Sequence, residues 1–121
     1  MVVIQEDSNN LIKLIQSVLT DDLRKKKYQG SSNKMKGHCY VASEALYHLL
    51  GGKSYGWIPQ NIKHEGESHW FLLHESGRII DVTSSQFITK VPTYKAIGRG
   101  FLTKQPSKRA KIVIDRLALT K

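Results

Sequence analysis

The chain has 121 residues, enough for one domain with its own core, and 40% of them are hydrophobic while 24% are charged. This composition excludes a disordered or low-complexity protein, and no stretch reaches the roughly 18 apolar residues of a membrane span. The formal net charge of +9 is concentrated in residues 90–121, which carry nine basic residues and one acidic residue. Such a surface attracts polyanions, and it also keeps a protein soluble.

The N-terminal part is predicted to be helical. Ser8, Asn9 and Asn10 offer a helix cap, and apolar residues follow at helical spacing from Leu11 to Leu19. Thr20 is a second predicted cap, for a short helix with two aspartates in its first turn and the basic run Arg24–Lys27 at its end. Residues 29–33 have the composition of a loop.

The central part is predicted to be a helix followed by strands. A helix over residues 39–50 carries one apolar stripe and ends at two glycines. Patterns typical of strands cover residues 55–63, 69–73 and 78–82, with turns between them, and the proline in the first strand suggests a sheet edge. Residues 83–106 are less regular, and Ser107 is predicted to cap a helix that runs to about Leu119.

This order of elements predicts an α+β fold. We expect one domain over residues 1–121, in which N-terminal helices and a central helix that begins at the cysteine pack on a small antiparallel sheet with a C-terminal helix. Its parts are a helical N-terminal part (1–36), a core that carries the chemistry (37–87) and a basic C-terminal part (88–121).

Cys39 is a candidate nucleophile, and the alternative is a buried, inert cysteine. It lies at the predicted start of a helix, directly after Gly37 and His38. Unpaired N–H groups and the helix dipole at this position favour an anion, so we expect the pKa of the thiol to be lowered. It is also the one cysteine of the chain, which excludes an internal disulfide and favours a reducing compartment.

His69 and Asp81 are predicted to be neighbours on one face of the sheet. If Glu75, Ser76 and Gly77 form a three-residue loop with Gly77 at positive φ, Leu73 pairs with Ile79. The two residues are then diagonal partners, with Trp70 and Leu72 on the opposite face. An aspartate after two isoleucines needs a hydrogen-bond donor, and a histidine N–H is suitable. The alternatives are a purely structural pair, or an exposed aspartate that ends the strand.

The three residues together predict a catalytic triad. The Cys39 thiolate would attack an acyl carbonyl, His69 would transfer the proton, and Asp81 would hold the imidazole tautomer. Backbone N–H groups at the helix start would bind the oxyanion, and the candidate side-chain donors are Asn33, His38 and Gln86. The expected activity is hydrolysis or acyl transfer at an amide, peptide or isopeptide bond of a protein or peptide substrate, without a cofactor.

These motifs resemble the papain-like superfamily, and more narrowly its transglutaminase-like branch and the related bacterial cysteine peptidases. The resemblance rests on Gly37-His38-Cys39 before a helix, on His69-Trp70, and on the run from Gly77 to Thr83. It covers about residues 37–87 and implies Cys39 as nucleophile, His69 as base and Asp81 as the residue that orients it. No glutamine precedes Cys39 at the position where papain-type enzymes place an oxyanion donor.

Two other functions compete with this one. Cys39, His64, His69 and Asp81 could bind zinc, but their spacing matches no zinc-finger or zincin pattern, so we predict no metal. His64, in a charged turn, is expected to be exposed. A basic binding protein for nucleic acid or a partner protein, with a vestigial triad, is the second alternative. Because aromatic residues are sparse in the basic part, we expect nucleic-acid binding to be non-specific and salt-dependent.

Overall fold

The α+β fold is confirmed in a computed structural model that describes residues 5–24, 28–30, 35, 37–84, 87, 89–101 and 105–119. Three α-helices and four strands lie within these residues. In chain order they are α1 (Gln5–Val18), α2 (Cys39–Leu49), β1 (Trp57–His64), β2 (Glu67–His74), β3 (Ile79–Ile80), β4 (Ile97–Gly98) and α3 (Lys108–Leu119). Short 3₁₀ helices cover Asp21–Leu23, Gly52–Tyr55 and Thr93–Lys95.

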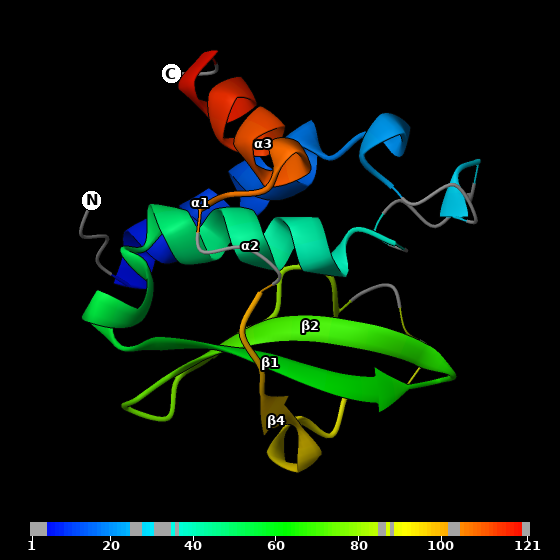
Figure 1. The fold of residues 1–121 in the computed structure, drawn as a ribbon, viewed down its shortest axis with the longest axis vertical. Coiled ribbons are helices and arrows are strands. Elements are labelled where there is room, and N and C mark those ends of the chain that lie inside the picture. Colours follow the sequence, from blue (N-terminus) through cyan, green and yellow to red (C-terminus); the bar gives the residue numbers. More distant parts are fainter. Residues whose placement is uncertain are drawn as a thin grey trace.

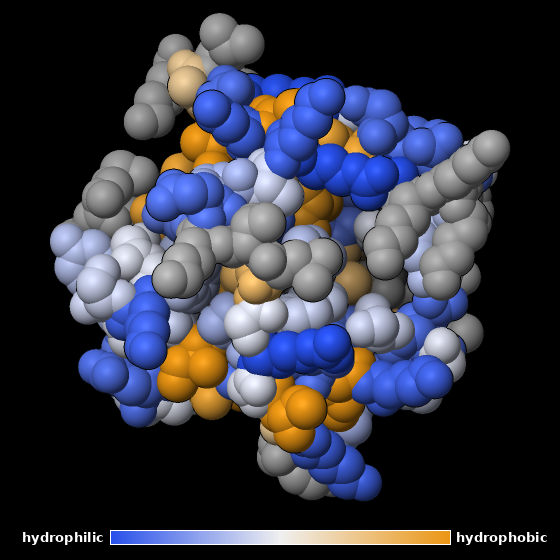
Figure 2. All heavy atoms as spheres, viewed as in Figure 1, coloured by the Kyte–Doolittle hydropathy of each residue, from blue (hydrophilic) through white to orange (hydrophobic). Residues whose placement is uncertain are grey.

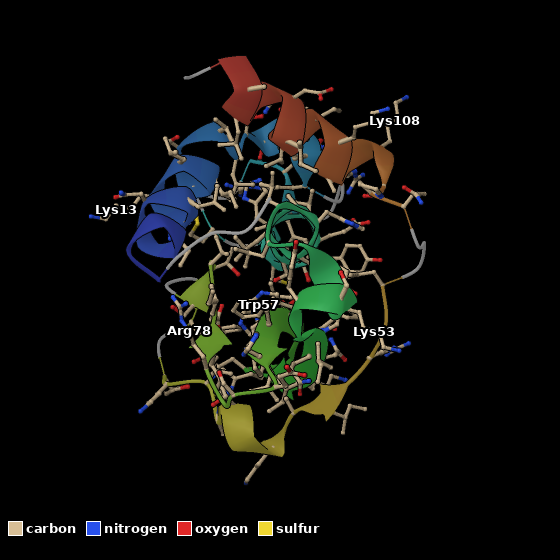
Figure 3. All side chains as sticks on the ribbon, turned by 90° about the vertical axis from the view of Figure 1, so that its left-hand side faces the viewer. Lys13, Lys53, Trp57, Arg78 and Lys108 are labelled. Carbon is tan, nitrogen blue, oxygen red and sulfur yellow. The ribbon has the colours of Figure 1, made fainter. Side chains whose placement is uncertain are left out.

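Helix α2 lies between the sheet and the other two helices (Figure 1). Its small and apolar side chains pack in both directions, because Ala42, Ala45 and Leu46 are completely buried. The sheet contributes Leu72 and Ile80 to this core, and α3 contributes its own apolar stripe of Ala110, Val113 and Leu117. The labelled Trp57 lies between the sheet and α2 in Figure 3. The apolar stripe predicted for residues 39–50 therefore does form the centre of the molecule.

All strand pairs are antiparallel, in the order β3-β2-β1-β4. Strands β1 and β2 form a hairpin whose two turn residues, Glu65 and Gly66, both have positive φ. Two positive φ values match the right-handed twist of the flanking strands, so the hairpin needs no longer loop. The prediction that β1 is an edge strand is wrong in part. Strand β4 pairs with it at Gln60 and Asn61, and the Pro59 carbonyl accepts the Arg99 N–H at 3.0 Å. Pro59 has no N–H to return this bond, so it marks the end of the short pairing with β4.

The second hairpin has the register that the sequence predicts. Leu73 pairs with Ile79, the His74 N–H donates to the Arg78 carbonyl at 2.8 Å, and Gly77 has a φ of +95°. The strand predicted over residues 78–82 is shorter, because β3 ends at Ile80. The Asp81 carboxylate accepts the Thr83 N–H at 3.3 Å, and this local side-chain bond replaces the sheet ladder.

The predicted helix ends are correct at the C-terminal helix and wrong at the first one. The Ala110 N–H donates to Ser107 Oγ at 3.3 Å, so Ser107 caps α3 as predicted. Helix α1 already begins at Gln5, so the predicted cap residues Ser8 to Asn10 lie inside it. Packing of its apolar face, with Ile15 fully buried, outweighs their preference for caps. Thr20 makes no side-chain cap bond, because its hydroxyl bonds the side chains of Asp22 and Arg116.

Candidate functional site

Helix α2 begins at Cys39, beside the stretch of strand β2 whose outer edge is not paired by β3. The His74 N–H points toward β3. Backbone N–H and C=O groups alternate in direction along a strand, so those of Ser68 and Trp70 point toward the same edge of β2 as those of His74. Strand β3 pairs only with Leu72 and Leu73. The Cys39 thiol lies 3.5 Å from the Ser68 carbonyl, and Ser43 Oγ donates to the Trp70 carbonyl at 3.0 Å. Side chains of α2 therefore pair carbonyls that the sheet leaves free.

His69 lies between these two contacts in sequence and holds Asp81. Its Nε2 is 2.6 Å from Asp81 Oδ2, and its side chain is fully buried, whereas 12% of the Asp81 side chain is exposed. The predicted pairing of the two residues across the hairpin is thus present. Thr83, which the sequence indicates only as the end of the motif run, donates its backbone N–H to the other carboxylate oxygen. No sequence signal indicates such a backbone role.

The bond to Asp81 determines what the other ring nitrogen can do. A neutral imidazole that donates its Nε2 proton to a carboxylate keeps a lone pair on Nδ1. Nδ1 of His69 is buried and has no hydrogen-bond partner in the described part of the chain. Phe71 stacks on this ring at 6.1 Å between centroids, and Phe87 contacts it edge-on at 4.7 Å. This second ring nitrogen is therefore unpaired among the described residues, inside an apolar wall, and Cys39 makes no hydrogen bond to it.

The prediction of a lowered pKa for Cys39 is wrong for this state of the protein. Burial raises the pKa of the thiol to about 11, since only 7% of the residue is exposed. Backbone groups of Trp70, Tyr40 and Cys39 itself act in the opposite direction and favour the thiolate. The negative charge of Asp81 adds to the rise in pKa, so the carboxylate acts on the sulfur as well as on His69. The resting thiol is protonated at neutral pH.

Of the three accessory residues predicted from the sequence, His38 alone belongs to the described residues. His38 is fully buried, and its Nε2 lies 2.9 Å from the Thr20 carbonyl, so this nitrogen ties the start of α2 to the segment after α1. Asn33 and Gln86 lie outside the described residues. His64 is less exposed than predicted, with 14% of its side chain accessible, because its ring packs on Phe87 and bonds the Thr89 carbonyl.

A pocket of about 480 Å³ adjoins the cysteine without containing it. Gly37 and Tyr40, which flank His38 and Cys39, line it together with Ser68 and Trp70, which flank His69. The pocket therefore lies directly beside the backbone that contacts the sulfur. Figure 2 shows the surface hollowed between α3 and α2, with apolar atoms inside and hydrophilic side chains along the α3 margin.

The described part of the chain contains neither a metal site nor a membrane span. No group of three or more His, Cys, Asp or Glu side chains among the described residues could hold a metal ion. None of the described helices is both long enough and apolar enough to cross a bilayer.

Comparison with known proteins places the chain in a family. Residues 7–117 match the family model described as YunG protein. No curated protein and no solved structure matches the chain.

Proposed function

We propose that this chain, which belongs to the YunG protein family, is a thiol-dependent acyl hydrolase or acyltransferase that acts on an amide, peptide or isopeptide bond. One observation carries the proposal. His69 is held by Asp81 at 2.6 Å with its Nδ1 buried and unpartnered in the described residues, and the Cys39 sulfur contacts the carbonyl of the preceding residue, Ser68, at 3.5 Å. A structural histidine gains stability by satisfying both ring nitrogens, and this one leaves an acceptor unused.

The proposed reaction follows from these atoms. The Cys39 thiol gives its proton to His69 Nδ1 as the sulfur forms a bond to the carbonyl carbon of the substrate. The resulting imidazolium is stabilised by Asp81, and it then donates the proton to the leaving amine as the C–N bond breaks. The product is a thioester on Cys39. Water or an acceptor amine attacks this thioester, with His69 now taking the proton of the attacking group, and the free thiol is restored.

Backbone groups are suited to stabilise the oxyanion of this reaction. The first N–H groups of an α-helix have no acceptor within the helix. Those of Cys39 and Tyr40 lie close enough to the sulfur to affect its pKa, as does Trp70 on β2. Fixed donors in a dry site stabilise developing negative charge without reorganisation. These donors compensate for the missing glutamine that the papain resemblance leads one to expect.

Burial of the thiol fits a nucleophile that is activated only during the reaction. With a pKa of about 11, Cys39 is protonated in the resting protein and is protected from oxidation. Proton transfer to His69 then occurs when an acyl group occupies the site. We place the activity in the cytoplasm, where a lone thiol stays reduced.

Acylation of Cys39 by p-nitrophenyl acetate tests the proposal. We expect release of p-nitrophenolate together with the mass of one acetyl group on Cys39, followed by loss of that mass as the thioester is hydrolysed. Cys39→Ala should show neither signal while it keeps the circular dichroism spectrum of the native protein. An acetyl group that Cys39→Ala acquires at the same rate, or that resides on lysines alone, would overturn the proposal.

A further inference from the structure

Three basic residues line the pocket beside Cys39. Arg99 follows β4, and Lys108 and Arg109 open helix α3. All three are exposed, and none forms an ion pair with a carboxylate in the part of the chain that the structure describes. Figure 3 shows the labelled Lys108 at the start of α3, projecting away from the body of the molecule. The pocket thus carries cations from two separate segments.

Among the described residues, the lining of the pocket contains neither aspartate nor glutamate, so no carboxylate balances this charge from within. The carboxylate of Glu44 is nearby in the fold but is already used. It is fully buried and accepts the Ser107 N–H at 2.8 Å and the Ser107 hydroxyl at 2.6 Å. Like charges held together without a partner repel one another, and an anionic ligand relieves that repulsion.

Much of the remaining lining of the pocket is apolar. Leu23, Tyr40, Val41 and Trp70 form it. Tyr40 packs edge-on against Trp70 at 5.0 Å between ring centroids, and Phe101 stacks on Trp70 at 5.4 Å. A volume of about 480 Å³ lies within the range of small-ligand sites. The pocket therefore suits an occupant that joins an apolar body to an anionic group.

We propose that this pocket binds a carboxylate-bearing residue of a peptide substrate next to the bond that Cys39 attacks. This inference rests on the proposed function, because the pocket adjoins the thiol through Ser68 and Trp70. The carboxylate pairs with the basic residues, and the aliphatic part of the same residue or of its neighbour contacts the apolar lining. The substrate class is then an acidic peptide, in which the carboxylate belongs to an aspartate or glutamate or to a chain end.

A peptide fits these observations better than a nucleic acid does. Proteins that bind single strands need a basic track and exposed aromatic faces on which bases stack. Trp70 is only 9% exposed, and its ring is covered by Tyr40 and Phe101. The three cations line one pocket of limited size, about 480 Å³. This geometry recognises one anionic group together with an apolar neighbour.

The test measures binding in the Cys39→Ala protein, so its result does not depend on catalysis. The probe is an acetylated, amidated hexapeptide of alanines with one phenylalanine and one glutamate, and its control has glutamine in place of glutamate. A third peptide has glutamine and a free C-terminal carboxylate. Calorimetric titration is repeated on a variant with Lys108→Gln and Arg109→Gln. A matched variant with Lys53→Gln and Arg78→Gln loses the same charge at positions that do not line the pocket (Figure 3).

We expect the glutamate peptide to bind at least about tenfold more tightly than the glutamine peptide, as a charge-assisted pair requires. The Lys108 and Arg109 variant should lose this preference, and the matched variant should keep it. Tight binding of the third peptide would assign the site to a chain end within the same proposal. Equal affinity for the glutamate and glutamine peptides would overturn the inference, as would equal loss in both variants. So would displacement of the glutamate peptide by a short single-stranded DNA that binds more tightly and depends on Lys108 and Arg109. Acylation of Cys39 without any of this selectivity would leave the proposed function standing and refute the pocket alone.

Discussion

Alkylation of Cys39 by iodoacetamide at neutral pH should be about a hundredfold slower in the folded protein than in the unfolded chain. The thiolate is the reacting species, and a pKa of about 11 in place of 9.0 lowers its fraction by about two powers of ten. Limited access, with 7% of the residue exposed, slows the reaction further. The assay is intact-mass spectrometry of the single cysteine over time, with and without denaturing urea.

The pH dependence of the same reaction identifies the cause. The alkylation rate of the folded protein should rise about tenfold per pH unit and level off near pH 11. Folding stability should respond with the opposite sign. Between about pH 9 and 11 the unfolded thiol loses its proton while the folded thiol keeps it, so stability falls by about 1.4 kcal/mol per pH unit relative to Cys39→Ala. Fast alkylation at neutral pH would refute this reasoning, because it would require a resting thiolate paired with a protonated His69.

Two further predictions concern the scaffold around the site. Glu44→Ala should lower the free energy of unfolding by about 3 kcal/mol and Tm by about 10 °C, because the Ser107 N–H and hydroxyl lose their hydrogen-bond acceptor. Glu44→Gln should lower the free energy of unfolding by about half as much. Urea denaturation measures both, and a loss below about 1 kcal/mol for alanine would contradict the role given to this carboxylate. Gly37→Ala should cost about 1–3 kcal/mol, since φ is +85° there and the new Cβ would lie 2.7 Å from Tyr28 Cβ. Thermal melting that leaves Tm unchanged would show that the start of α2 tolerates a side chain.

Much of the fold near the site could be predicted because it depends on local pattern. Helix α2 follows from its apolar stripe and Gly51, whose φ is +93°. The approach of His69 to Asp81 follows from a three-residue loop that fixes the register of two strands. These features involve residues no more than 12 positions apart.

The remaining features depend on contacts between distant segments. Strand β4 has two residues, too few to show an alternation of apolar and polar side chains. It is a strand only because it pairs with β1. The pKa of Cys39 depends on how deeply β2 and α2 bury the sulfur, and a helix start alone predicts the wrong direction. Arg99 and Lys108 are predicted only as parts of a basic surface, and the chain path between β4 and α3 brings them to one pocket.

A double-mutant cycle on His69 and Asp81 tests most directly whether the two residues and Cys39 act as one catalytic unit. The quantity measured is the rate constant for acylation of Cys39 by p-nitrophenyl acetate in four proteins: native, His69→Ala, Asp81→Asn and the double variant. The account predicts that each single change lowers the rate on the order of 10²-fold or more, and that the double variant is little slower than either one. Losses that multiply, or an Asp81→Asn protein that acylates at the native rate, would contradict it.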